Sequence, residues 1–263
     1  MSKPGFPTPS PSESHPSRGE MSVLDLYCGE GGAAAGYMAA GLGVVGVDRG
    51  NFRKRYPGAF LCCDVPSIDP RFVALFPFVH ASPPCQFVTE LNSDKGRHVN
   101  LIPATRRLIA RANEIRLGRG ELPIRHVIEN VRAARPHLID PVSLFGTMFD
   151  CHMVTSAGQR FDLSRERLFE TNWPLAAAPD PGPRHPIANV FGAHLRVRSG
   201  DFRTGKGTGR TVDLPGEERA ALARQLMGMP WATMTGMSEA VPPAYTAFIG
   251  EQLIQQRRLL VAA

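Results

Sequence analysis

The sequence predicts an α/β fold built on a doubly wound, mostly parallel sheet with a small loop-rich insert. Three observations support this prediction. Short apolar runs alternate with helix-length segments between residues 23 and 129. A Gly-rich turn follows the first apolar run, and polar residues stand at the ends of the later runs. In such sheets the carboxyl ends of the strands form one crevice, so these residues are expected to face each other.

The predicted elements follow one another in a regular order. Strands are expected at residues 23–27, 44–48, 60–63, 78–81 and 126–129. Helices are expected at 33–40, 71–76, 103–117, 217–227 and 243–257, and Pro103 suits the first turn of its helix. The periodicity weakens after residue 169, where Pro, Gly, Arg and His accumulate. We therefore expect a main domain at 21–172, a small insert at 173–213, and C-terminal helices at 214–263 that complete the main domain.

We expect a cytoplasmic protein and a monomer. Hydrophobic residues make up 43% of the 263 residues, which is enough for a sizeable core. No apolar run has the length that a membrane span requires. Residues 1–20 carry Pro, Ser and Gly without an apolar block, so we expect a disordered tail and no signal peptide.

The formal charge of +6 and the sequence pI of about 9.4 suit a polyanionic partner. Arg greatly outnumbers Lys, which occurs only at positions 3, 54, 95 and 206. Arg binds phosphates and guanine in a bidentate manner, but a GC-rich genome explains the bias equally well. The five cysteines contain no Cys-x-x-Cys pair, so we expect reduced thiols and no metal site.

The Gly-rich turn belongs to the segment Asp25-Leu-Tyr-Cys-Gly-Glu-Gly-Gly-Ala-Ala-Ala-Gly36. Glycines at 29, 31 and 32 allow a tight turn, and the following helix directs its N-terminal amides at a ligand. Alone, this turn would also suit a dehydrogenase. Asp48 is placed to accept hydrogen bonds from ribose hydroxyls, and Asp64 from an adenine amino group. The ordered set favours a nucleoside cofactor over strand-end capping.

Cys85 lies in a stiff loop, Ser82-Pro-Pro-Cys-Gln86. Two prolines fix where the thiol points, and a thiolate is a strong nucleophile once its pKa is lowered. The alternative is a buried structural cysteine, which the polar Gln86 and the residues behind it disfavour.

Charged residues at 129, 165 and 167 complete the candidate site. Glu129 ends a buried strand, where a carboxyl group without a partner would be costly. Arg165 and Arg167 project to the same side if their segment is extended, and together could hold an oxygen or a phosphate. Alone, an Arg-x-Arg pair is more often solvated surface.

In this order, the motifs resemble those of the DNA (cytosine-5) methyltransferase family. The likeness spans residues 23–257 and includes the C-terminal segments 225–230 and 240–243. Residues 140–149 and 167–170 are similar to the compact bacteriophage and bacterial members. The resemblance implies a Rossmann-like fold that uses S-adenosylmethionine, and an enzyme of phages or restriction-modification systems.

The resemblance also implies a role for each motif. Cys85 would add to carbon-6 of a cytosine flipped out of the duplex. Glu129 would activate the base at N3, and Arg165 and Arg167 would hold it. The residues implied to surround the cofactor are Asp25, Tyr27, Gly29, Gly31, Gly32, Asp48, Asp64, Pro83, Glu239 and Val241.

The sequence departs from the family pattern at three points. Leu163 stands where the family usually has Gln, and Asp48 stands where Glu is common. Ser238 and Glu239 replace the usual Gly-Asn, which puts a carboxylate near the cofactor or the catalytic loop. This last departure leaves the exact cofactor open.

The expected partner is double-stranded DNA, with neither membrane nor metal. The residues expected to contact DNA are Gln86, Arg184, Arg196, Arg198 and Arg203. The segment for target recognition is short, so a short recognition site is expected. An RNA cytosine methyltransferase, or a catalytically silent DNA-binding relative, would show similar motifs. An amino-methyltransferase is disfavoured, because those enzymes use a Pro-Pro-Tyr type of loop and need no thiol.

Overall fold

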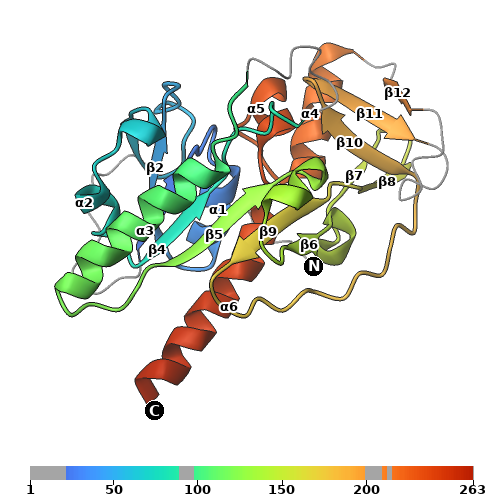
Figure 1. Ribbon diagram of the computed structural model, residues 1–263. Helices are drawn as coiled ribbons and strands as arrows, with labels where there is room; N and C mark the ends of the chain where they lie inside the picture. Colours follow the sequence, from blue (N-terminus) through green and yellow to red (C-terminus); the bar gives the residue numbers. More distant parts are fainter. Residues whose placement is uncertain (1–21, 89–97, 199–208, 212–214, 263) are drawn as a thin grey trace.

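The computed structural model in Figure 1 describes residues 22–88, 98–198, 209–211 and 215–262. Within these residues the strands form two sheets. The larger has seven strands in the order β3-β2-β1-β4-β5-β9-β6, and the smaller has five in the order β12-β11-β10-β8-β7. The predicted α/β class with a large, mostly parallel sheet is confirmed.

The five strands expected from the sequence form the parallel part of the large sheet. They are β1 (Ser22–Leu26), β2 (Gly43–Asp48), β3 (Ala59–Cys62), β4 (Phe78–Ala81) and β5 (Arg125–Asn130). Two further strands, β9 (Arg167–Thr171) and β6 (Val142–Leu144), extend it in antiparallel fashion beside β5. These two were not expected, because each is short and offers little alternation to detect.

Helices cover both faces of the large sheet (Figure 1). The helices α1 (Gly32–Ala39) and α6 (Pro243–Ala262) pack on one face, and α2 (Pro70–Val73) and α3 (Ile102–Gly118) on the other. Strand β1 shows how alternate residues contribute to the two hydrophobic cores. Val23 joins the cluster under α1 and α6, while Leu24 and Leu26 join the cluster under α3, because successive side chains point to opposite faces.

The C-terminal helix is packed closely onto α1. A Cβ atom on Gly36 would lie 2.1 Å from both the carbonyl oxygen of Pro243 and Oγ1 of Thr246. Thr246 Oγ1 also donates to the carbonyl oxygen of Ala33 at 2.9 Å. The end of the chain therefore contributes to the same core as the first strands.

The smaller sheet contains β7 (His152–Val154), β8 (Arg160–Leu163), β10 (Ile187–Phe191), β11 (His194–Arg198) and β12 (Gly209–Thr211). It is covered by α4 (Gly216–Met227), and α5 (Met234–Glu239) follows. The segment expected to be a loop-rich insert thus contains regular strands. The sheet also takes β7 and β8 from before residue 173, and the covering helix comes from after residue 213.

No helix in the described part of the chain is long and apolar enough to span a membrane.

Candidate active site

Four loops after parallel strands are joined in two pairs at the carboxyl ends of the strands in the large sheet. The amide of Gly29 donates to Asp48 Oδ2 at 3.0 Å, which links the loops after β1 and β2. Asn130 Nδ2 donates to the carbonyl oxygen of Pro83 at 2.8 Å, which links the end of β5 to the loop after β4. The edge that the sequence predicts as a site is therefore held together by hydrogen bonds between its own loops.

The three glycines of the first loop have different surroundings. Gly29 has a φ of +51° and open space where a Cβ would lie. A Cβ on Gly31 would lie 2.3 Å from Cδ of Pro57, and one on Gly32 would lie 2.2 Å from the carbonyl oxygen of Val241. Gly31 and Gly32 thus allow close packing of the protein on itself, and Gly29 borders open space.

Glu30, in the same loop, has a role that the sequence did not reveal. Its buried carboxylate accepts hydrogen bonds from the amide and the hydroxyl of Thr233, at 2.7 and 2.8 Å. Trp231 Nε1 donates to its carbonyl oxygen at 2.8 Å. These contacts tie the glycine loop to the segment before α5, so that the two cofactor motifs implied by the resemblance are physically connected.

Asp25 is fully buried beneath this loop. Its Oδ2 accepts a hydrogen bond from the Tyr56 hydroxyl at 3.1 Å, and Oδ1 has no hydrogen-bond partner among the described residues. Burial raises the pKa of Asp25 to about 8, and the charges of Asp48 and Glu129 add to this while Tyr56 opposes it. With no exposed surface, Asp25 supports the loop from below.

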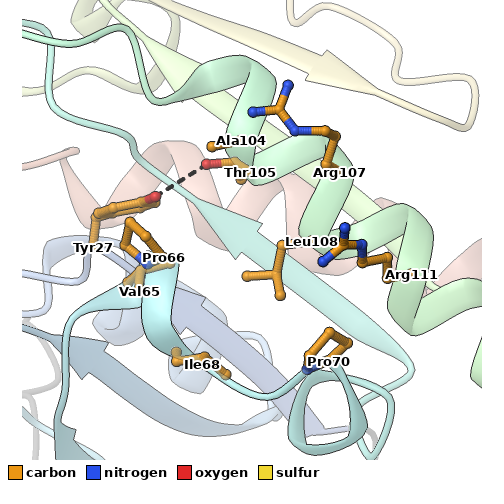
Figure 2. A pocket seen from close by; sticks show the side chains of 10 residues that line it. All are labelled: Tyr27, Val65, Pro66, Ile68, Pro70, Ala104, Thr105, Arg107, Leu108 and Arg111. Atoms are coloured by element: carbon orange, nitrogen blue, oxygen red, sulfur yellow. Dashed lines mark hydrogen bonds between the residues drawn. The ribbon is translucent and has the colours of Figure 1, made fainter.

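A cleft of about 190 Å³ lies next to the first loop, between α3 and the short 3₁₀ helix at Val65–Ser67 (Figure 2). Tyr27 forms one wall, and its hydroxyl points to Thr105, with 3.2 Å between the two oxygens. Val65 and Pro66 form another wall. Asp64, the expected adenine acceptor, is exposed and directly precedes this 3₁₀ helix.

Cys85 is half-buried in the loop after β4. The bond from Asn130 holds this loop at Pro83, which is buried, and the amide of Val88 donates to the carbonyl oxygen of Cys85 at 3.0 Å. Gln86 is also half-buried. The loop is therefore bonded to β5 just before the thiol and forms a tight turn just after it.

Glu129 is the penultimate residue of β5 and has 5% of its surface exposed. Its Oε1 lies 3.0 Å from Arg167 Nε, and the Ser82 hydroxyl is a further hydrogen-bond partner. Burial raises the pKa of Glu129, while Arg167, Ser82 and Arg165 act to lower it. Burial is the largest of these influences, so the Glu129 carboxyl group keeps a proton more readily than an exposed glutamate does.

Arg165 and Arg167 diverge, in contrast to the expectation that both hold one ligand. Arg167 begins β9 and faces Glu129. Arg165 is buried, and all of its N–H groups are used within the protein. It donates to the carbonyl oxygens of Ser238, Ala240 and Val190 at 2.7 to 3.1 Å, and to Asn189 at 3.4 Å. Arg165 therefore joins the two sheets and the C-terminal segment, while Arg167 pairs with Glu129.

Glu239 and Val241 lie after the Thr233 segment, close to the glycine loop. The carbonyl oxygen of Val241 packs over Gly32. Glu239 has an exposed side chain, yet its pKa is raised. The largest cause is partial loss of hydration, and repulsion from Asp48 and Glu30 adds to it. The unusual carboxylate of the sequence thus lies near other acidic groups at the mouth of the glycine loop.

The basic residues of β11 project from one face of the smaller sheet. In β11 the side chains alternate, so that Leu195 and Val197 are buried in the cluster with α4 and Arg196 is exposed. Arg198, on the same side as Arg196, is half-buried. Arg203 lies outside the described residues.

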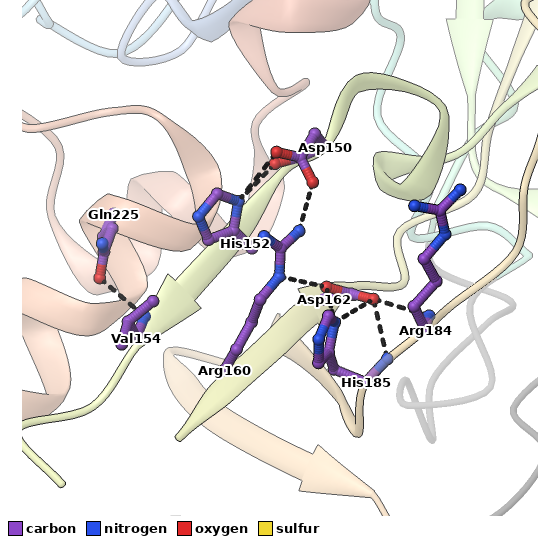
Figure 3. A network of polar contacts seen from close by, with 8 residues as sticks. All are labelled: Asp150, His152, Val154, Arg160, Asp162, Arg184, His185 and Gln225. Atoms are coloured by element: carbon purple, nitrogen blue, oxygen red, sulfur yellow. Dashed lines mark hydrogen bonds and ion pairs between the residues drawn. The ribbon is translucent and has the colours of Figure 1, made fainter. Parts of the chain in front are cut away.

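Arg184 precedes β10 and is held at its backbone. Its amide donates to Asp162 Oδ2 at 2.9 Å, while its guanidinium points away from that residue (Figure 3). The network around Asp162 includes His185 and Arg160, which also pairs with Asp150. Buried Asp162 thus fixes the chain just before β10 and leaves the Arg184 side chain exposed.

Among the described residues there is no cluster of His, Cys, Asp and Glu suited to a metal ion. The five cysteines, all in the described part, form no disulfide.

Solved structures with the same fold are methyltransferases. One is a prophage-encoded E. coli protein assigned as a DNA modification methyltransferase, with 12% identity, a TM-score of 0.53, and coverage of 89% of this chain and 99% of that one. The chain has a methyltransferase fold. Spodoptera frugiperda DNMT2 matches with 13% identity, a TM-score of 0.54, and 89% and 98% coverage. Entamoeba histolytica methyltransferase EhMeth matches with 11% identity, a TM-score of 0.55, and 91% and 99% coverage. Neither a protein-family model nor a curated protein matches the sequence.

Proposed function

We propose that the protein is a DNA cytosine-5 methyltransferase that uses S-adenosylmethionine. The observation that carries this proposal is the link between the Cys85 loop and the end of β5. Asn130 holds that loop through Pro83, while the adjacent Glu129 pairs with Arg167. The loop that carries Cys85 and the strand that carries Glu129 are thereby bonded to each other, on a methyltransferase fold, which supports a nucleophile and a carboxyl group acting on one base.

The roles of the residues follow from the chemistry of cytosine, whose carbon-5 is a poor nucleophile. The Cys85 thiolate adds to carbon-6, and the Glu129 carboxyl group shares a proton with N3 to accept the displaced electron density. Carbon-5 then has enamine character and takes the methyl group. Loss of the carbon-5 proton and expulsion of the thiolate restore the aromatic ring. Arg167 holds Glu129 in place throughout.

The residues around the first loop fit the proposed cofactor. S-adenosylmethionine supplies an electrophilic methyl group on a positively charged sulfur. Open space borders Gly29, and the carboxylates of Asp48, Glu239 and Glu30 are close enough to influence one another. Such a negative environment stabilises a sulfonium and an ammonium group. Asp48 would accept from the ribose, and Asp64 from the adenine beside the Tyr27 cleft.

A DNA substrate is supported by charge and geometry. The formal charge is +6, and exposed Arg184 and Arg196 lie just before β10 and in β11. Carbon-6 is inaccessible in a stacked duplex, so the cytosine would be flipped out to reach Cys85.

The test is a covalent trap. Duplex DNA with 5-fluorocytosine at candidate sites has no carbon-5 proton to lose, so the Cys85 adduct should accumulate with the methyl group transferred. Cys85→Ala should form no adduct, and Cys63→Ala, which removes another half-buried thiol, should behave as wild type. Folded RNA carrying the same base forms the second arm. Adducts on RNA alone would refute the DNA assignment, and adducts in Cys85→Ala would refute the mechanism.

A further inference from the structure

A chain of buried polar side chains extends behind Glu129, away from the space where a base would lie. The Tyr37 hydroxyl, on α1, lies 2.9 Å from His80 Nδ1, on β4. His80 Nε2 lies 3.0 Å from Ser82 Oγ, and the Ser82 hydroxyl bonds to Glu129. Tyr37 and His80 have no exposed surface. Neither residue is needed for the chemistry proposed above, and a buried imidazole is costly unless both nitrogens are bonded.

The hydrogen bonds that link Tyr37, His80, Ser82 and Glu129 have a preferred direction. Burial lowers the pKa of His80 to about 3, so the ring is neutral and has one donor and one acceptor nitrogen. Among the described residues, His80 Nδ1 is the hydrogen-bond partner of the Tyr37 hydroxyl. If Tyr37 donates to Nδ1, the proton of the ring lies on Nε2, which donates to Ser82. The Ser82 hydrogen is then directed to Glu129. The reverse order would leave the Tyr37 hydrogen in the core without an acceptor.

We propose that His80, held by Tyr37, is a positioning residue that directs the Ser82 hydroxyl hydrogen onto the Glu129 carboxylate. This inference rests on the proposed function, in which Glu129 exchanges a proton with the base. A donor aimed at the carboxylate favours its ionised form and fixes its rotamer. One side of Glu129 is then occupied by Ser82 and Arg167, and the carboxyl group remains oriented toward the base.

Every element that packs against these hydrogen-bonded side chains contributes charged or titratable groups. Glu129 is influenced by Arg167 at the start of β9, by Arg165 before it, and by Asp25 on β1. The ring of His80 meets Tyr37 on α1. Loss of the Ser82 donor leaves the two arginines in place, so the expected effect on Glu129 is limited in size and upward in direction.

The first measurement concerns the tautomer and needs no activity. Nitrogen-15 NMR of the histidine rings in the full chain, with His80 assigned by its loss in His80→Gln, should show a proton on Nε2 and none on Nδ1. A ring protonated on Nδ1, or on both nitrogens near pH 7, would overturn the proposal.

The second measurement follows Glu129. The pKa of its carboxyl group, read by carbon-13 NMR and assigned with Glu129→Gln, should rise by about one pH unit in His80→Leu. His80→Gln, whose amide can donate in place of Nε2, should restore most of the wild-type value, and Tyr37→Phe should give a smaller rise. Thr171→Val is the control, because it removes a half-buried hydroxyl bonded to Trp173 at the opposite end of β9.

Steady-state kinetics tests whether these hydrogen bonds affect catalysis. His80→Leu should lower kcat for methyl transfer about tenfold, because the Glu129 carboxyl group loses the donor that fixes its rotamer, with little change in KM for DNA or cofactor. An unchanged Glu129 pKa in His80→Leu and Tyr37→Phe would refute the positioning role. A wild-type chain with the expected tautomer and pKa shift, but no methyl transfer to cytosine, would instead refute the proposed function.

Discussion

Replacement of Gly36 by Ala should loosen the contact between α1 and α6. The new Cβ would lie 2.1 Å from the carbonyl oxygen of Pro243 and from Thr246 Oγ1, and 2.7 Å from the amide nitrogen of Ala247. Carbon atoms in packed interiors keep about 3.5 Å from their neighbours, so α6 would have to move by roughly 1 Å. Two of the three atoms belong to the backbone, which prevents relief by a change of rotamer.

The magnitude follows from two opposing contributions. Overpacking costs about 1–3 kcal/mol and occasionally more, and three overlapping atoms place Gly36→Ala at the upper end. Alanine regains about 1 kcal/mol of helix propensity. The net loss of about 2 kcal/mol corresponds to a fall in Tm of roughly 4–8 °C for a chain of this size.

The assay is thermal and urea unfolding followed by circular dichroism. Gly118→Ala is the matched control, because a Cβ there meets nothing within 4 Å at the end of α3. It should leave Tm unchanged or slightly raised. A Gly36→Ala chain that melts at or above the wild-type temperature would show that α6 does not depend on this close approach.

Two further predictions concern pH and DNA. Asp25 has a pKa of about 8 in the folded chain against 3.8 in a model compound, so its contribution to stability falls as pH rises from about 4 to 8. Between pH 5 and 7, the free energy of unfolding of Asp25→Asn, measured in urea, should rise by about 2–3 kcal/mol relative to wild type. The same pH dependence in both proteins would contradict this. Arg196→Ala should weaken binding roughly 5- to 100-fold at particular sequence contexts, with Arg119→Ala as control. An even loss across all contexts, with a shallower salt dependence, would indicate phosphate contact instead.

Local sequence patterns were sufficient for the parallel half of the large sheet. Its strands are continuous apolar runs, such as Val44–Val47, bounded by turn residues, and this pattern needs no knowledge of distant contacts. The strands of the smaller sheet are short and lie among Pro and Gly. Leu195 and Val197 acquire their buried face only because α4, a later segment, covers them.

The motifs around Cys85, Glu129 and the glycine loop could be found from the sequence because each combines reactive groups with residues that constrain the backbone. The residues that bond to these motifs could not be found in this way. Arg165 and Arg167 are two residues apart, yet one bonds to the C-terminal segment and the other to Glu129, since the chain enters β9 between them.

The sequence by itself determined the order of the strands and helices in the first half of the chain and the residue types at their ends, because both depend on neighbours along the chain. Only the tertiary structure decided which buried polar groups meet. The hydrogen-bonded series from Tyr37 through His80 and Ser82 to Glu129 joins a helix, two strands and a loop. Hydrogen bonds between such distant segments leave no periodicity in the sequence, since they depend on how the sheet brings those segments together.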